Sequence, residues 1–168
     1  MIPSDHFVRF YNEIFKFLQR RGRSELEKYY DIVANRQAQF CLEQFKKDGF
    51  KGMFEYWDRI RIEENCDFTL EYDDEHYRGR MNVCPSLAKN LDNDAGACKV
   101  YCDHCPGWVL RVFTRAGFYG VYDLEGRDKP SCDIWEYKDR AKAEKKKAEL
   151  LALRGDPDLI KDNFDTLA

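Results

Sequence analysis

Cysteine is the residue type with the widest range of reactive and metal-binding chemistry in this 168-residue chain, which carries seven cysteines. Cys98, Cys102 and Cys105 follow one another with the spacing C-x3-C-x2-C. On a continuous helix the outer two would lie about 10 Å apart, because each residue advances the axis by ~1.5 Å. A zinc ion with Zn–S bonds of ~2.3 Å could not bind both without unwinding the helix. Cys102 and Cys105 therefore remain as one pair of metal ligands.

Further ligands would have to come from elsewhere in the chain. Cys84, Cys132 or His104 could complete a site around Cys102 and Cys105. Four thiolates suit zinc, and thiolates also hold iron–sulfur clusters. One interpretation is therefore a zinc or iron–sulfur cofactor on Cys84, Cys102, Cys105 and Cys132.

A nucleophilic thiol is a second interpretation, centred on Cys102. Asp103 and His104 follow it directly and are candidate acid/base groups. A neighbouring imidazolium lowers a thiol pKa and increases the fraction of reactive thiolate. Adjacent side chains on a helix point about 100° apart, so His104 need not touch Cys102. His76 or a carboxylate brought in by the fold is the alternative partner.

Aromatic and arginine side chains are candidates for contacting a ligand. Trp108 and Tyr119 could line a pocket together with Cys84 and Cys132, although aromatic residues at such positions are more often core. A guanidinium matches a carboxylate geometrically, while surface ion pairing explains the same residues equally well. The arginines concerned are Arg78, Arg80, Arg111 and Arg115.

The remaining cysteines have simpler explanations. Cys41 and Cys66 lie on apolar faces of ordinary elements and are expected to act as small buried hydrophobic residues. The same spacing argument makes Cys98 a doubtful member of any site.

The first 62 residues are expected to be helical. Ser4 could cap a helix with apolar residues at helical spacing up to Leu18, ending near Gly22. Ser24 and Glu27 have the spacing of a capping box for a second helix, which continues until Gly49. A shorter aromatic segment follows.

The hydrophobic period changes to two in residues 63–137. Strands are predicted at 66–72, 77–83, 118–124 and 131–137, and opposite charges should face each other across the first hairpin. The helix bearing Cys98, Cys102 and Cys105 should break or kink at Pro106. A closing helix occupies 138–155 and a tail 156–168. The sequence thus predicts one α+β domain over 1–155, with a helical N-terminal half packed on a small antiparallel sheet.

Charge and hydropathy exclude several classes of protein. The net charge of −3 argues against nucleic acid as a partner, because phosphate binding usually leaves a basic excess. No stretch approaches the ~20 apolar residues needed to cross a bilayer. The N-terminus lacks the pattern of a secretory signal, so we expect a cytoplasmic chain whose cysteines are thiols, with no membrane partner. The sequence does not determine the oligomeric state, and a homo-oligomer is compatible with it.

Residues Val83 to Tyr137 resemble the L-2-amino-thiazoline-4-carboxylic acid hydrolase-like family. The matching features are Cys84-Pro85 at a strand end, Tyr101-Cys102-Asp103 downstream, and a closing Ser131-Cys132-Asp133-Ile134 strand. The resemblance implies a vinyl-reductase-type ligand-binding architecture and hydrolytic opening of a small ring that contains sulfur and nitrogen and bears a carboxylate. Carried over by position, Cys84, Cys102 and Cys132 become site candidates, with Asp103 beside them. The segment from Asp103 to Trp108 is richer in ligand-type residues than the family pattern, which leaves the substrate in doubt.

The sequence is therefore compatible with three functions. The first is a hydrolase-like enzyme acting on a small cyclic C–N/C–S carboxylate through a cysteine-centred site. Its catalytic residues would be Cys102, Asp103 and His104, and its substrate-binding residues Cys84, Trp108, Tyr119 and Cys132. The second is the zinc or iron–sulfur module, and the third is a non-catalytic domain that binds a small molecule.

Overall fold

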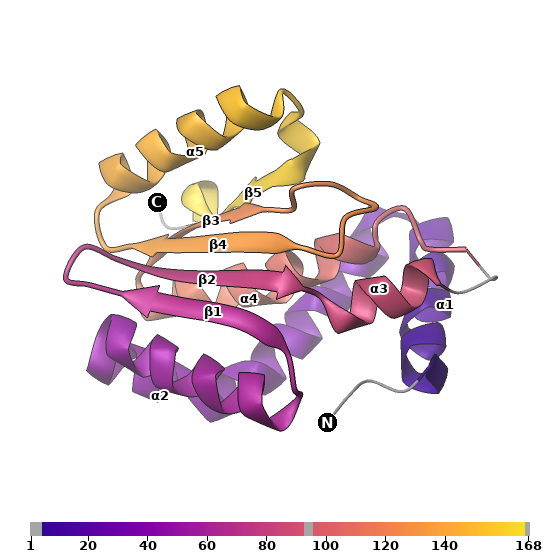
Figure 1. Cartoon of the computed structure of the whole chain (residues 1–168), viewed down its shortest axis with the longest axis horizontal. Helices are drawn as coiled ribbons and strands as arrows, with labels where there is room; N and C mark the ends of the chain where they lie inside the picture. The colour runs from indigo at the N-terminus through magenta and orange to yellow at the C-terminus, as the bar shows by residue number, and fades with distance from the viewer. Residues whose placement is uncertain (1–4, 93–95, 167–168) are drawn as a thin grey trace.

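A single antiparallel sheet organises the molecule (Figure 1). The computed structural model describes residues 5–92 and 96–166, and the predicted Ser4 cap and part of the loop after Asp92 lie outside these ranges. In spatial order the strands are β1 (Asp67–Tyr72), β2 (His76–Val83), β4 (Cys132–Tyr137), β3 (Tyr119–Asp123) and β5 (Ile160–Asp162). Each neighbouring pair is antiparallel. The predicted α+β class is confirmed, whereas the vinyl-reductase-type architecture stays a prediction.

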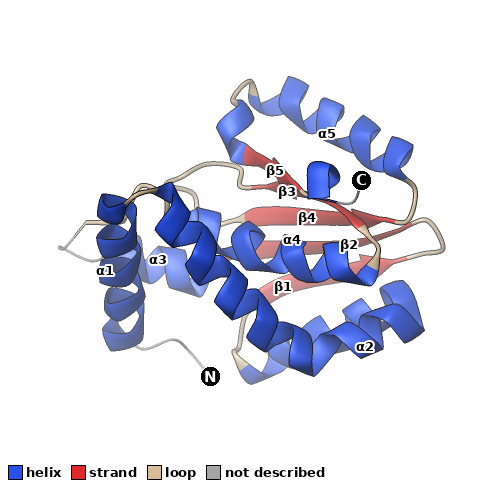
Figure 2. Cartoon of the chain, turned by 180° about the vertical axis from the view of Figure 1, so that it is seen from behind, coloured by secondary structure: helices blue, strands red, loops and turns tan. Residues whose placement is uncertain are grey.

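Strand alternation gives the sheet two different faces. Tyr77, Tyr122 and Ile134 point inward and pack against the helices α2 and α4, which Figure 2 shows crossing one side of the sheet. On the opposite face α5 covers strands β3, β4 and β5. The uncovered part of that face, on β1 and β2, is polar, and Arg78 Nη1 donates to Glu71 Oε1 across the hairpin at 2.9 Å. This is the cross-strand pairing that the sequence predicts.

Glycines interrupt the N-terminal helices where the pattern predicts. Helix α1 spans Asp5–Arg21, and α2 spans Arg23–Glu63 with a sharp bend at Gly49, whose φ of 60° and ψ of −135° are not helical. The predicted capping box is wrong, because α2 is capped by Gly22 with no side-chain hydrogen bond. Glu27 instead forms ion pairs with Arg23 and Arg111, so its carboxylate serves a tertiary contact.

The cysteine-bearing segment departs from the prediction of one helix. Cys98 lies in a loop, a 3-10 turn covers Tyr101–Asp103, and α4 runs over His104–Ala116. Pro106 neither breaks nor kinks α4, because it occupies the first turn, where a backbone N–H has no helical partner. Upstream, α3 (Pro85–Leu91) begins after Cys84, whose Sγ accepts a hydrogen bond from the Leu87 amide at 3.4 Å.

Gly107 lets α4 approach α2 closely. A Cβ atom at this position would lie 2.5 Å from Cδ2 of the Tyr30 ring, closer than carbon atoms can pack. The absence of a side chain therefore fixes how near the two helices lie. This contact also brings charged residues of α2 and α4 together, as described below.

The segment expected to be a tail is part of the fold. After α5 (Arg140–Arg154) come a 3-10 turn at Pro157–Leu159, strand β5 and another 3-10 turn at Phe164–Thr166. The side chain of Asn163 fastens this segment, since its Oδ1 accepts from the Gly120 amide at 2.8 Å and its Nδ2 donates to the Phe118 carbonyl at 2.9 Å.

Candidate functional site

Four cysteines from separate parts of the chain line one small cavity of about 30 Å³. Cys84 follows β2, Cys102 lies in the 3-10 turn, Cys105 in the first turn of α4, and Cys132 begins β4. These are the cysteines that the sequence selects, while Cys98 is buried elsewhere, against α1. The other lining residues are Leu87, Tyr101, His104, Tyr122, Leu124 and Ser131.

Burial keeps these thiols protonated. Desolvation raises the pKa of Cys102 and of Cys132 to about 12, and raises that of Cys105 well above its ordinary value. Desolvation also raises the pKa of Cys84, and the backbone hydrogen bonds to its sulfur only partly offset that effect. Because the thiolate is the nucleophile, this environment disfavours attack by Cys102.

His104 is held as a neutral ring beside the cavity. Desolvation lowers its pKa to about 4, and its Nδ1 hydrogen-bonds to the Tyr101 carbonyl oxygen. Its ring stacks on Phe15 with centroids 5.1 Å apart and lies 4.7 Å from the Trp108 ring. A weakly basic imidazole packed among aromatic rings is poorly suited to withdrawing a proton from a thiol.

The cavity is not a metal site as it stands. Among residues 5–92 and 96–166, no group of three or more histidine, cysteine, aspartate or glutamate side chains is arranged to hold a metal ion. The convergence of Cys84, Cys102, Cys105 and Cys132 therefore brings thiols into one compartment without forming a ligand set. A volume of about 30 Å³ is also of the order of a water molecule or two, which is too small for a ring-shaped substrate.

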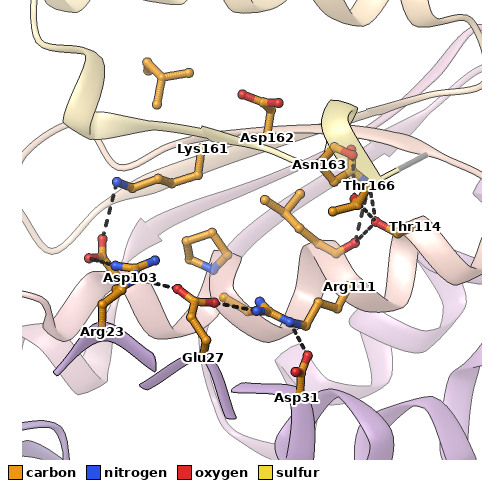
Figure 3. A pocket seen from close by; sticks show the side chains of 14 residues that line it. Arg23, Glu27, Asp31, Asp103, Arg111, Thr114, Lys161, Asp162, Asn163 and Thr166 are labelled. Atoms are coloured by element: carbon orange, nitrogen blue, oxygen red, sulfur yellow. Dashed lines mark hydrogen bonds and ion pairs between the residues drawn. The ribbon is translucent and has the colours of Figure 1, made fainter. Parts of the chain in front are cut away.

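A much larger pocket of about 600 Å³ lies beside α4 (Figure 3). Its walls are the first turns of α2, one side of α4, and strand β5 with the turn after it. We call it the charged groove. Its lining residues are Arg23, Glu27, Asp31, Asp103, Pro106, Gly107, Leu110, Arg111, Thr114, Ile160, Lys161, Asp162, Asn163 and Thr166.

Opposite charges alternate along this groove. Figure 3 shows them in the order Lys161, Asp103, Arg23, Glu27, Arg111 and Asp31. The α2 members are four residues apart and so share one helix face. Arg111 lies across from them on α4, and its Nε and Nη2 donate to Asp31 and Glu27.

Asp103 marks the point where the two compartments separate. Its side chain is 5% exposed and faces Arg127 Nη1 at 2.5 Å, Arg23 Nη1 at 3.6 Å and Lys161 Nζ at 3.8 Å. Cys102 and Cys105 line the cysteine cavity, whereas Asp103 lines the groove. The residues predicted as a catalytic group are therefore divided: Cys102 and His104 line the cysteine cavity, whereas Asp103 faces cations in the groove.

Other predicted site residues lie outside both compartments. Trp108 packs among Tyr30 and His104. Tyr119 faces the α5 side of the sheet, against Phe164, because an odd step along β3 separates it from the inward-facing Tyr122. His76 begins β2, where its ring stacks on Trp135, away from the cysteine cavity.

The four arginines proposed for carboxylate recognition all have partners within the chain. Arg78 and Arg80 bind Asp133 on the outer face of the sheet, and Arg115 Nη1 donates to Asn35 at 2.7 Å. Arg111 is the one of the four that lines the charged groove. Surface pairing thus accounts for three of the four.

Sequence reasoning missed the residues that complete the groove. Arg23, Glu27 and Asp31 carry a signal, charges repeated every four residues, which also describes an ordinary solvent-facing helix. Lys161 and Asn163 lie in the segment expected to be a tail and carry none. Tyr122, whose Oη lies 3.6 Å from Cys132 Sγ, could have been found from strand alternation.

Comparison of the chain with protein-family models, with curated proteins and with solved structures gives no match. Within the described ranges, no helix combines the length and the apolar character required to traverse a lipid bilayer.

Proposed function

We propose that this chain binds a small zwitterionic carboxylate in the charged groove. The observation that carries the proposal is the alternation of cations and carboxylates along one wall, from Lys161 to Asp31. A ligand that carries both signs of charge can take the place of one cation and one carboxylate in this series, so that every charge keeps a partner of opposite sign. The groove volume of about 600 Å³ falls within the usual range for small-molecule sites.

The carboxylate end of the ligand would bind between Arg23 and Lys161. Their nitrogens lie 3.6 and 3.8 Å from Asp103, beyond good hydrogen-bonding distance, whereas Arg127 approaches the same carboxylate at 2.5 Å. Asp103 therefore keeps its main partner when Arg23 and Lys161 turn toward a ligand. The guanidinium of Arg23 can bind a carboxylate through two parallel hydrogen bonds.

The cationic end of the ligand would face Asp31 and Glu27. Asp31 is more than half exposed while paired with Arg111, so its second oxygen can accept a hydrogen bond from an amino or amidinium group. Two opposite charges on one small molecule agree with the substrate class implied by the family resemblance, the amino-thiazoline carboxylates. Binding is proposed ahead of hydrolysis because burial holds the Cys102 thiol in its unreactive form.

Calorimetric titration with L-2-amino-thiazoline-4-carboxylate and with its methyl ester tests the proposal. The acid should bind, and the ester, which keeps the cationic end but lacks the carboxylate, should bind at least about tenfold more weakly, equivalent to ~1.4 kcal/mol. Lys161→Met should weaken acid binding by about tenfold, whereas Lys145→Met, on the exposed face of α5, should not change it. Equal affinity for acid and ester, or no effect of Lys161→Met, would contradict the groove as the site.

A second experiment with the same protein distinguishes binding from catalysis. Incubation with the acid should leave the ring intact, as measured by chromatography of the recovered ligand. Ring opening by the wild type that is lost in Cys102→Ala would instead support the hydrolase interpretation.

A further inference from the structure

Helix α1 presents two apolar faces, although it packs against the rest of the chain with only one. The inward face carries Val8, Asn12 and Phe15, each at most 1% exposed. Asn12 fastens the helix, since its Nδ2 donates to the Gly96 carbonyl and its Oδ1 accepts from the Cys98 amide, both at 2.8 Å. The helix is thus held in one rotational setting, which leaves its second apolar face pointing outward.

The outward face is aromatic. Phe7, Phe10, Tyr11 and Phe17 are 63, 59, 44 and 48% exposed, and Ile14 between them is only partly buried. Four large rings on about three turns of one helix exceed the scattered apolar residues of an ordinary surface. Figure 1 shows α1 at one end of the molecule, and no helix or strand of the described residues lies beyond it on that side.

The spacing of this face is that of a helix-pairing seam. Phe7, Phe10, Ile14 and Phe17 are separated by three, four and three residues, which are the a and d positions of two heptads. Arg21, at the next seam position, turns back so that its guanidinium lies 4.9 Å from the centroid of the Phe17 ring. The seam therefore ends in a charge, which restricts it to two heptads.

We propose that this face pairs with α1 of a second copy of the chain. An a/d seam packs best against another a/d seam, and a second copy supplies one with the same length and the same charged end. At ~200 Å² for a ring side chain, the exposed fractions amount to roughly 400 Å² of aromatic surface per chain. That is about half of the ~800 Å² that a stable partner buries, so the seam forms the apolar centre and neighbouring polar residues form the rim.

Sedimentation velocity of the full chain from about 1 to 200 μM tests the proposal, because dimer formation depends on concentration. The wild type should sediment with twice the 20.0 kDa mass of one chain at the upper end of this range. Phe10→Glu and Phe17→Glu should each weaken self-association about 30-fold or more, as expected for a central aromatic anchor. Their circular dichroism should not change, because both side chains already face solvent.

Phe40→Glu serves as the matched control, since Phe40 is 74% exposed on α2 and lies outside the seam. It should dimerise as the wild type does. A wild-type monomer at the highest concentration would overturn the proposal and leave this face to a different partner. Dimers that survive Phe10→Glu and Phe17→Glu, or that Phe40→Glu disrupts equally, would also overturn it.

Discussion

The carboxyl group of Glu136 makes the stability of this protein depend on pH in a way that a single substitution should remove. Glu136 lies on the helix-facing side of β4 with 0% exposure, between Tyr77 on β2 and Gly120 on β3. Neither of its carboxyl oxygens has a hydrogen-bond partner among the described residues. Burial raises its pKa well above the ordinary value of 4.5, so the native protein keeps a proton there.

The sign of the effect follows from the two states. Above pH 4.5 the unfolded chain releases this proton and the native chain retains it, so stability falls as pH rises. The slope for one proton approaches ~1.4 kcal/mol per pH unit. His104 acts in the opposite direction: its pKa is lowered from 6.5 to about 4, so stability is lost as pH falls through that interval.

These two groups nearly cancel between pH 4.5 and 6.5. Above pH 6.5 Glu136 dominates, and the buried thiols, whose pKa values are raised from 9.0, add to its effect only as the pH approaches 9. While the carboxyl stays protonated, the free energy of unfolding should fall by up to ~1.4 kcal/mol between about pH 6.5 and 7.5. Glu136→Gln keeps the shape and removes the titration, so its free energy of unfolding should be constant over this interval.

Urea denaturation at the two ends and the middle of this interval measures the effect. The exposed Glu63→Gln is the matched control and should retain the wild-type slope. A wild-type protein with pH-independent stability, or a Glu136→Gln variant that retains the slope, would refute the argument from burial.

Three further predictions concern the cysteine cavity and the groove walls. In native protein treated with iodoacetamide, Cys102 should react no faster than the buried Cys41, as measured by peptide mass spectrometry, and faster reaction would restore the nucleophile interpretation. Gly107→Ala should lower the free energy of unfolding by about 1–3 kcal/mol, since its Cβ would overlap the Tyr30 ring, and a neutral result in urea denaturation would contradict the close helix approach. Asn163→Leu should lower the free energy of unfolding by about 2–4 kcal/mol, because the Gly120 amide and the Phe118 carbonyl lose their hydrogen-bond partner. An unchanged thermal midpoint would contradict this prediction.

Much of the fold could be predicted because local patterns and tertiary structure agree. Gly22 and Gly49 interrupt the helices where they interrupt the apolar pattern, and alternation from Phe68 to Tyr72 marks β1. Pro106 misled the prediction, because a proline in the first turn of a helix and one in its interior look alike in sequence. Strand β5 has three residues, too few for a recognisable period.

The cysteine cavity and the groove differ in how far the sequence predicts them. Cys84 and Cys132 lie at strand ends, and Cys102 and Cys105 lie at the start of a helix. The positions of these element boundaries in the sequence therefore already favour a shared site. The groove depends on how α2 crosses α4, which is a tertiary distance fixed by Gly107 and Tyr30. No local pattern near Arg23 or Lys161 reports that distance.

The late position of β5 in the chain bears on the order in which the groove can form during synthesis. A nascent chain that has emerged as far as α5 already contains Arg23, Asp103 and Arg111, but Lys161 and Asn163 are still to come. Until they arrive, the free edge of β3 has no neighbour and the groove has no third wall. The groove is therefore complete only in chains translated through residue 166, and the unpaired edge of β3 is the part of the nascent chain most exposed to wrong strand pairing.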